Sequence, residues 1–266
     1  MKKITGTSLL AMKGASEKIV SLTAYDYSFA AVLDAAGVDV ILVGDSLGMV
    51  MQGLDSTLPV TMDEMVYHGR CVASACGRSL VLVDMPFMSY QASTEQALVN
   101  AGRLMKEGGA EMIKLEGGAA IIDTVRALSD SGIPVCGHLG LTPQSVHKFG
   151  GYKVQGREQH AADKMKQDAL ALQDAGATLL VLEAVPRTLA KAITGALRIP
   201  TIGIGAGLDT DGQVLVLQDM IGIYPKPSPK FSRNFMDDAE DIQGAIKSYV
   251  EAVRNGSFPA TEHSFD

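Results

Sequence analysis

The sequence has few cysteines, no excess of positive charge and no long apolar run. Lys and Arg total 23 against 30 Asp and Glu, so the formal net charge is -7 and the pI is near 5.2. Such an acidic chain lacks the basic footprint of a nucleic-acid-binding protein. Nowhere does the sequence contain the run of about 18 apolar residues that a bilayer span requires. We therefore expect neither nucleic acid nor a membrane as a partner.

The cysteines and the first residues predict a cytoplasmic protein. Cys71, Cys76 and Cys136 are odd in number and lack the spacing of a zinc ribbon. The simplest interpretation is that each is a small buried side chain that stays reduced in the cytoplasm. The first 18 residues begin with two lysines, but Lys13 interrupts their short apolar stretch. This pattern favours a first amphipathic helix over a signal peptide.

Short apolar, β-branched runs alternate with helical patterns along the chain. This alternation predicts a parallel sheet covered by helices. The 266 residues fit a single (β/α)8 TIM-barrel domain over 1–266, with an N-terminal helix and a C-terminal helical tail. An open doubly wound sheet is the alternative. The strand candidates are 20–24, 40–43, 80–83, 112–115, 135–139, 179–182, 201–205 and 214–217, and the helical patterns include 94–107, 120–130, 162–174 and 188–197.

A weak internal repeat places acidic residues at strand ends. Residues 35–45, 107–116 and 174–183 each read as a helix end, a glycine, a strand and then an acid. Glycine is typical of the left-handed position that closes a helix. The repeat therefore predicts that Asp45, Glu116 and Glu183 follow strands, and the strand at 80–83 also ends in an acid, Asp84. In a parallel barrel these ends share the face that carries active sites.

Two segments interrupt the alternation. Residues 47–59 form a long connection rich in Gly, Ser and Thr, which predicts a mobile loop over the site. Thr61 and Glu64 then have the spacing of a capping box at the start of a helix. The prolines of 224–235 exclude a helix or a central strand there. A helix from about 238 to 254 follows, and we expect this tail to pack on the barrel or on a neighbouring subunit.

Four acids on one face predict a metal site. A lone carboxylate at a strand end is usually a helix cap or an ion-pair partner, but crowded unpaired carboxylates repel one another and need a cation. The sequence has no matching set of His or Cys ligands. Oxygen ligands suit a hard ion, so Mg²⁺ is favoured over Zn²⁺.

Strand alternation extends the candidate site beyond the acids. Lys114 and Glu116 point to the same side of their strand, so Lys114 faces the barrel mouth if Glu116 does. It then suits an anionic substrate or the metal carboxylates, and the alternative is that it only pairs with a neighbouring acid. Glu183 follows an apolar run, and partial removal from water suits a general base. His138 ends the fifth strand, where it could bind a ligand or only satisfy hydrogen bonds in the core.

Other motifs are weak or missing. Neither a Gly-x-Ser-x-Gly elbow nor a P-loop lysine motif occurs. The glycine-rich stretch 203–207 is similar to a truncated dinucleotide fingerprint but lacks its final glycine spacing. In a barrel it favours a close approach of the backbone to a ligand, or relief of crowding at the seventh strand end.

Long stretches of the chain resemble the ketopantoate hydroxymethyltransferase family. Together they extend over nearly the whole sequence, and residue 184 is an alanine where the family usually has cysteine. The matching stretches are TAYDYSFA (23–30), ILVGDSLGMVMQGLDSTLPVT (41–61), LVDMPFMSY (82–90), IKLEGG (113–118), PVCGHLGLTPQSVHKFGGYKVQGR (134–157), LLVLEAVP (179–186), IPTIGIGAG (199–207), PKFSRNF (229–235) and EHSF (262–265).

The resemblance implies a barrel related to the phosphoenolpyruvate-mutase and isocitrate-lyase group. It implies Mg²⁺ bound by Asp45, Asp84 and Glu116, and a proton-accepting role for Glu183. It also implies that a 2-oxo acid binds near several of the same residues. These substrate-binding residues are Asp45, Ser46, Asp84, Lys114 and His138.

The reaction implied is the transfer of a hydroxymethyl group from 5,10-methylenetetrahydrofolate to 3-methyl-2-oxobutanoate. Its product is 2-dehydropantoate, for pantothenate and coenzyme A synthesis, and Mg²⁺ assists enolisation of the 2-oxo acid. The family assembles as a homodecamer, a pentamer of dimers. Two alternatives stay open: a carbon–carbon lyase or phosphomutase that acts on another 2-oxo acid, and a non-catalytic protein that binds a metabolite.

Overall fold

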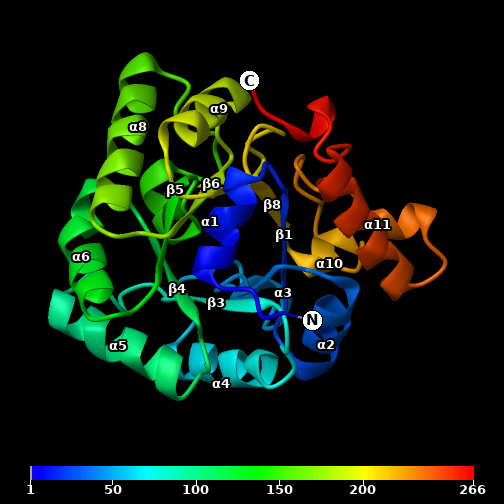
Figure 1. Ribbon diagram of the computed structural model, residues 1–266, viewed down its shortest axis with the longest axis horizontal. Helices are drawn as coiled ribbons and strands as arrows, with labels where there is room; N and C mark the ends of the chain where they lie inside the picture. Colours follow the sequence, from blue (N-terminus) through cyan, green and yellow to red (C-terminus); the bar gives the residue numbers. More distant parts are fainter. Residues whose placement is uncertain (1) are drawn as a thin grey trace.

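A computed structural model describes residues 2–266 and contains a closed barrel of parallel strands (Figure 1). Each strand pairs with the next, and the last pairs with the first, where Ser21 is level with Val214. The predicted (β/α)8 barrel is confirmed, and the open sheet is wrong because this last pairing closes it. The strands are β1 (Ile19–Thr23), β2 (Val40–Val43), β3 (Leu80–Asp84), β4 (Met112–Glu116), β5 (Val135–Gly140), β6 (Leu179–Glu183), β7 (Thr201–Ile204) and β8 (Gly212–Leu215).

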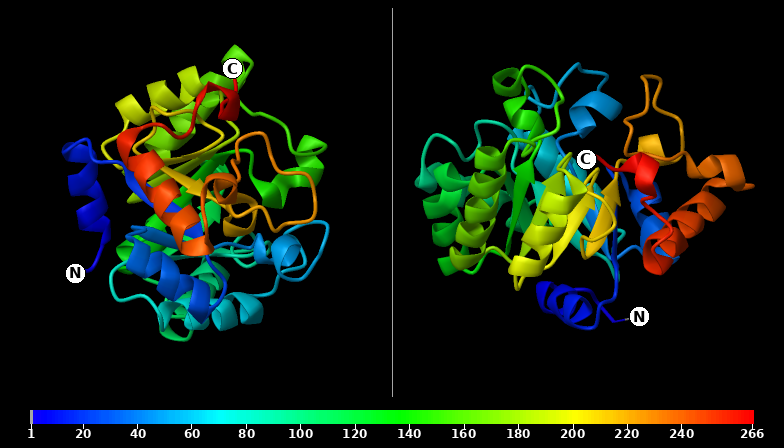
Figure 2. Two further views of the ribbon diagram at one scale, coloured as in Figure 1. Left: turned by 90° about the vertical axis from the view of Figure 1, so that its right-hand side faces the viewer. Right: turned by 90° about the horizontal axis from the view of Figure 1, so that it is seen from above.

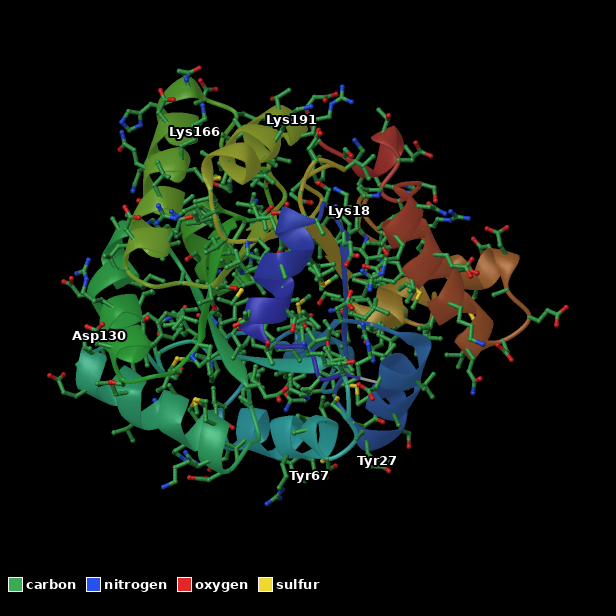
Figure 3. All side chains as sticks on the ribbon, in the orientation of Figure 1. Lys18, Tyr27, Tyr67, Asp130, Lys166 and Lys191 are labelled. Atoms are coloured by element: carbon green, nitrogen blue, oxygen red, sulfur yellow. The ribbon has the colours of Figure 1, made fainter. Side chains whose placement is uncertain are left out.

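Helices surround the barrel, and their polar side chains point outward. Figure 3 shows Lys166, Lys191 and Tyr67 directed away from the strands. Thr61 Oγ1 accepts from the amide of Glu64, whose carboxylate accepts from the amide of Thr61, so the predicted capping box is confirmed. The surrounding helices are α2 (Tyr27–Ala36), α4 (Met62–Ala73), α5 (Thr94–Lys106), α6 (Ile122–Asp130), α8 (Gln159–Asp174), α9 (Arg187–Ala196) and α11 (Ile242–Asn255).

The helix α1 (Gly6–Gly14) closes the end of the barrel at which the strands begin. Its Leu9 and Met12 are buried against side chains of the barrel interior such as Leu80 and Met112. Figure 2 shows α1 at one end of the barrel and the 224–235 segment at the other. The interior is therefore filled with apolar side chains at one end, and a ligand can enter only from the end at which the strands finish.

The loops at the open end contain more helix than the sequence predicted. Residues 47–59 include the short helix α3 (Leu47–Val50), while their mobility stays a prediction. Two more short helices, α7 (Val146–Phe149) and α10 (Leu217–Met220), follow β5 and β8. β8 was predicted to extend to residue 217, but it ends at Leu215 because the amide of Leu217 donates to Thr23 Oγ1 and begins α10.

The C-terminal tail packs on the barrel of its own chain. α11 begins at Ile242, later than predicted, because Asp241 caps it after a separate turn at Phe235–Asp238. The hydroxyl of Tyr249 donates to the carbonyl of Ser21 at 2.9 Å. This contact attaches the tail to β1, next to the seam that closes the barrel.

The cysteines are free thiols, but they are not equally buried. Cys136 lies fully buried inside the barrel, as predicted. Cys71 and Cys76 are only half-buried, so the prediction that each cysteine is buried holds only in part for these two. Cys71 lies on α4 and Cys76 just beyond it, where the protein covers one side only. Within residues 2–266, every helix is too short or too polar to cross a membrane.

A fully buried carboxylate connects several elements at the closed end. Asp39 precedes β2, and its side chain lies 2.6 Å from the guanidinium of Arg78 and 2.6 Å from that of Arg254. It also accepts from the amide of Val20 at 2.9 Å. A charge removed from water needs such partners. Asp39 therefore holds β1, β3 and α11 together around the start of β2.

We expect Asp39→Asn to lower the free energy of unfolding by about 3 kcal/mol, because it leaves two guanidinium groups without their carboxylate. Urea denaturation would measure the change. The matched control is Asp209→Asn, since Asp209 forms an exposed ion pair with Lys191 and should contribute little. Equal effects of the two substitutions would contradict the anchoring role of Asp39.

Candidate active site

The predicted site residues meet at the open end of the barrel. Asp84, Glu116 and Glu183 are the last residues of β3, β4 and β6, and Asp45 follows the end of β2. They line one cavity of about 500 Å³. The structure therefore brings together all the residues that the sequence proposed. Ser46, Lys114 and His138 line the same cavity.

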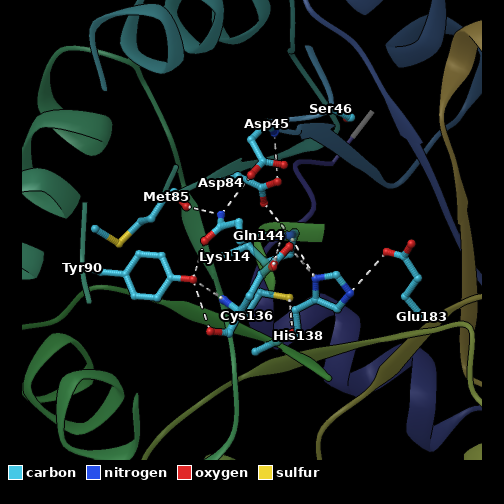
Figure 4. Close-up of polar contacts among 12 residues, drawn as sticks. Asp45, Ser46, Asp84, Met85, Tyr90, Lys114, Cys136, His138, Gln144 and Glu183 are labelled. Atoms are coloured by element: carbon cyan, nitrogen blue, oxygen red, sulfur yellow. Dashed lines mark hydrogen bonds and ion pairs between the residues drawn. The ribbon is translucent and has the colours of Figure 1, made fainter. Parts of the chain in front are cut away.

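Lys114 faces the acids, as strand alternation predicted. Its Nζ lies 2.8 Å from Asp84 Oδ1, and the two residues are level in the neighbouring strands β4 and β3 (Figure 4). Burial alone would lower the pKa of Lys114, but Asp84, Glu116 and Asp45 outweigh burial and raise it. Lys114 thus carries a positive charge in the cavity and also pairs with a neighbouring acid.

The site contains more buried carboxyl groups than positive charges. Burial raises the pKa of Asp45 well above its usual value, and the charges of Asp84 and Glu116 raise it further. Burial also raises the pKa of Glu116 to about 7, although Lys114 opposes the shift. Three acids against a single ammonium group leave negative charge that a bound cation would offset.

The oxygen ligands fit a hard cation such as Mg²⁺ in kind. Across residues 2–266, no three His, Cys, Asp or Glu side chains are gathered closely enough to form a complete ligand cluster. Mg²⁺ usually binds one or two carboxylates and completes its shell with water and substrate oxygens. The buried acids, with their surplus of negative charge, fit an ion held in that manner.

Gln144 is a site residue that the sequence did not reveal. Its Nε2 donates to Asp45 Oδ2 and to the carbonyl of Met85, both at 2.9 Å, and its amide donates to Glu116 Oε2 at 3.0 Å. Its Oε1 accepts from the hydroxyl of Tyr90 at 2.7 Å. Gln144 thus holds Asp45 and Glu116 in place. The only signal was its position in the Thr-Pro-Gln-Ser segment just after β5.

His138 lies between two carboxylates. Its Nδ1 is 3.3 Å from Glu116 Oε1 and 3.4 Å from Lys114 Nζ, while its Nε2 is 3.4 Å from Glu183 Oε2 (Figure 4). Burial lowers the pKa of His138, and Lys114 lowers it further. A neutral ring that accepts from Lys114 through Nδ1 carries its proton on Nε2, which faces Glu183. This position in the cavity favours a role in the site over a purely structural one.

Two hydroxyl groups meet at the start of α3. Ser46 lies 2.8 Å from the hydroxyl of Tyr25, measured between their oxygens. Tyr25 is fully buried, and burial raises its pKa. The phenol therefore stays protonated and can donate to Ser46, which would leave the serine proton free for a ligand in the cavity.

The backbone around Glu183 depends on a neighbouring glycine. Gly140 has φ +95°, and a Cβ at this position would lie 2.1 Å from the carbonyl oxygen of Glu183. Ala184 also adopts the left-handed region, with φ +46°. Left-handed backbone at a residue with a side chain is uncommon and costs free energy. The chain therefore turns sharply at this point, and Glu183 remains directed into the cavity.

The glycines within and directly after β7 relieve crowding, one of the two interpretations of 203–207. A Cβ on Gly203 would lie 2.7 Å from Thr210 Oγ1, and one on Gly205 would lie 2.9 Å from the ring of Phe231. Gly205 also has φ +64°. A close approach of a ligand to this backbone stays a prediction.

Solved structures share this fold at low sequence identity. Phosphoenolpyruvate phosphomutase from Streptomyces platensis subsp. rosaceus matches with a TM-score of 0.62 and 16% identity, over 82% of this chain and 83% of that chain. 2,3-Dimethylmalate lyase, a PEP mutase/isocitrate lyase superfamily member, matches with a TM-score of 0.57 and 16% identity, over 84% of this chain and 77% of that chain. The protein has the barrel fold of this superfamily, as predicted.

Sequence relatives narrow this class to one family. The family model of ketopantoate hydroxymethyltransferase matches residues 3–261. The 3-methyl-2-oxobutanoate hydroxymethyltransferase of Alkalilimnicola ehrlichii is 60% identical over 264 residues, which are 99% of this chain and 95% of that protein. The chain therefore belongs to the ketopantoate hydroxymethyltransferase family, and the resemblance that the sequence motifs indicated is confirmed.

We expect Gly140→Ala to destabilise the protein by roughly 2 kcal/mol more than Gly132→Ala. Both glycines have positive φ, so both substitutions strain the backbone, but a Cβ on Gly132 has no atom within 4 Å. The difference therefore reports the clash with the backbone of Glu183 and the neighbouring side chain of Val185. Urea unfolding of the two variants would measure it. Equal losses of stability would mean that the backbone at Glu183 adapts to the added methyl group.

Proposed function

We propose that this chain transfers a hydroxymethyl group from 5,10-methylenetetrahydrofolate to 3-methyl-2-oxobutanoate and forms 2-dehydropantoate for pantothenate and coenzyme A synthesis. Membership of the family supports this activity. The observation that carries it is that one cavity contains both the buried ammonium group of Lys114 and the separate carboxylate of Glu183. Lys114 belongs to the charged cluster, while Glu183 lies on the far side of His138.

The charged cluster suits the binding of a 2-oxo acid. The ammonium group of Lys114 would offset the negative charge of the substrate, and the hydroxyl of Ser46 would donate to one of its oxygens. Asp45, Asp84 and Glu116 would hold Mg²⁺, directly or through water. When bound, the ion would supply a Lewis acid that stabilises negative charge on the substrate oxygens.

Glu183 would accept the proton from C3 of the bound 2-oxo acid. Its side chain is 14% exposed and opens to the cavity, so it is available to a substrate while most of the water is excluded. In the tautomer with its proton on Nε2, His138 would donate toward this carboxylate and keep it oriented toward C3. A positioned general base of this kind typically contributes 10²- to 10⁴-fold to the rate, about 3 to 5 kcal/mol.

The atoms of the transfer balance with one water molecule. C3 forms a bond with the methylene carbon, both bonds from that carbon to folate nitrogens break, and water supplies the hydroxyl oxygen. The two nitrogens gain the C3 proton, relayed by Glu183, and one proton of the water. The products are 2-dehydropantoate and tetrahydrofolate.

We also propose that the chain works in the cytoplasm as a homodecamer, a pentamer of dimers. The support for both statements is the resemblance to the family and the composition of the chain.

Purified protein should exchange the C3 proton of 3-methyl-2-oxobutanoate with deuterium in the absence of folate, because enolisation precedes transfer. The exchange should require Mg²⁺ and stop when a chelator removes it. Proton NMR in deuterium oxide would follow the loss of the C3 signal. No exchange by folded, magnesium-loaded protein, or turnover of phosphonopyruvate or oxaloacetate instead, would reject the proposal in favour of a lyase or phosphomutase.

Glu183→Gln should lower the rate of C3 exchange by at least about 100-fold, because an amide cannot accept the proton. Binding of Mg²⁺ in the presence of the 2-oxo acid, measured by calorimetry, should stay nearly unchanged. Glu251→Gln on the exposed side of α11 is the matched control and should exchange normally. If Glu183→Gln abolished metal binding instead, Glu183 would be a ligand and not the base.

A further inference from the structure

One side of the cavity is apolar, and a small 2-oxo acid bound to the charged cluster would not occupy it. The charged cluster described above belongs to the ends of β2 to β6, whereas β7 and β8 contribute Ile204 and Val214 to the wall. Phe231 and Phe265 cover this side from the 224–235 segment and the C-terminal tail. A cavity of about 500 Å³ is in the range that accommodates much larger ligands. The apolar side, defined by these four residues, is therefore space for a second molecule.

A buried carboxylate without a partner lies in this apolar region. Asp219 is on α10, directly after β8, and it lines the cavity with 9% of its surface exposed. Throughout residues 2–266, its side chain has neither a hydrogen-bond donor nor an ion-pair partner. Burial raises the pKa of Asp219 to about 6. A carboxylate in an apolar setting is costly unless donors satisfy it, so a ligand with donors suits this position.

We propose that Asp219 binds the pterin ring of the folate co-substrate, with its two oxygens accepting hydrogen bonds from the N3–H and the 2-amino group. This inference rests on the proposed function. The pyrimidine edge of a pterin presents two adjacent N–H donors, which match one carboxylate in a bidentate pair. The flat ring itself suits the aromatic and aliphatic wall of the apolar side.

The charges at the rim fit the rest of a folate. Lys226 and Lys230 line the outer part of the same cavity, in the 224–235 segment that lies over the open end in Figure 2. Lys226 forms an exposed ion pair with Asp55, and Lys230 lies 5.1 Å above the ring of Phe265. The glutamate tail of folate carries carboxylates that such lysines attract. A pterin held inside would direct this tail outward to them.

The position of the base agrees with this placement. Glu183 ends β6 and is level with Ile204 of β7, so it lies at the border between the charged and the apolar sides. The pyrimidine edge of a pterin and the N5–N10 edge that carries the methylene carbon are on opposite sides of the ring. Holding the first at Asp219 leaves the second free to face the border at Glu183, where the carbon nucleophile forms.

Asp219→Asn tests the proposal because it keeps the shape of the side chain but replaces one acceptor by a donor. We expect the KM for 5,10-methylenetetrahydrofolate to rise about 10- to 100-fold. The folate-independent exchange of the C3 proton should stay within about twofold, which also reports that the variant is folded. Asp209→Asn removes the same charge outside the cavity and should change neither quantity. An unchanged KM together with normal exchange would overturn the pterin site.

A change on the ligand gives a second test that does not depend on turnover. Calorimetry should show that the unaltered protein binds tetrahydrofolate more tightly than its 2-desamino counterpart, and that Asp219→Asn nearly removes this preference. Equal binding of the two compounds by the unaltered protein, or no binding of either, would reject the role of Asp219. Absent C3 exchange in that protein would instead reject the proposed function, so the two failures are distinguishable.

Discussion

Three buried carboxyl groups, those of Asp45, Asp84 and Glu116, surround the single ammonium group of Lys114 at the open end of the barrel. Carboxylates this deeply buried repel one another, so they persist only where the surrounding structure prevents their separation. Rigid strand ends and the hydrogen bonds of Gln144 supply that constraint. The stability of the remaining barrel maintains this cluster, which is where we propose that a cation and an anionic substrate bind.

The mouth of the barrel is divided by chemistry as well as by strand order. The ends of β2 to β6 supply charged and polar groups, while β7 and β8 supply an apolar wall. Glu183 ends the strand that separates the two sides. Such a division suits the proposed reaction, which joins a small anionic acid to a carbon carried by a large flat molecule. Each reactant would then have its own surface, and the two would meet at the proposed base.

Regular patterns in the sequence predicted most of the architecture. The strands of a parallel barrel are buried on both sides, so they appear as continuous apolar runs, and their observed ends differ from the predicted ones by a few residues at most. The largest differences occur where a side chain decides the boundary. Thr23 ends β8 early by accepting from the amide of Leu217, a contact between distant parts of the chain that has no local signal. Asp241 delays the start of α11 by capping it from the position directly before the helix, which is a local signal.

By itself, the sequence determined the barrel, the face that carries the site, and the positions of its acids, its lysine and its histidine. These features follow from alternation and from acids at strand ends, which are local patterns. Only the tertiary structure decided which other side chains contact these site residues or share their cavity. Gln144 contacts Asp45 across 99 positions of the chain, and Asp219 lies in an apolar wall built from separate segments, with no side-chain partner among residues 2–266. Such relationships arise when the barrel closes, because closure, not sequence proximity, determines which side chains share the cavity.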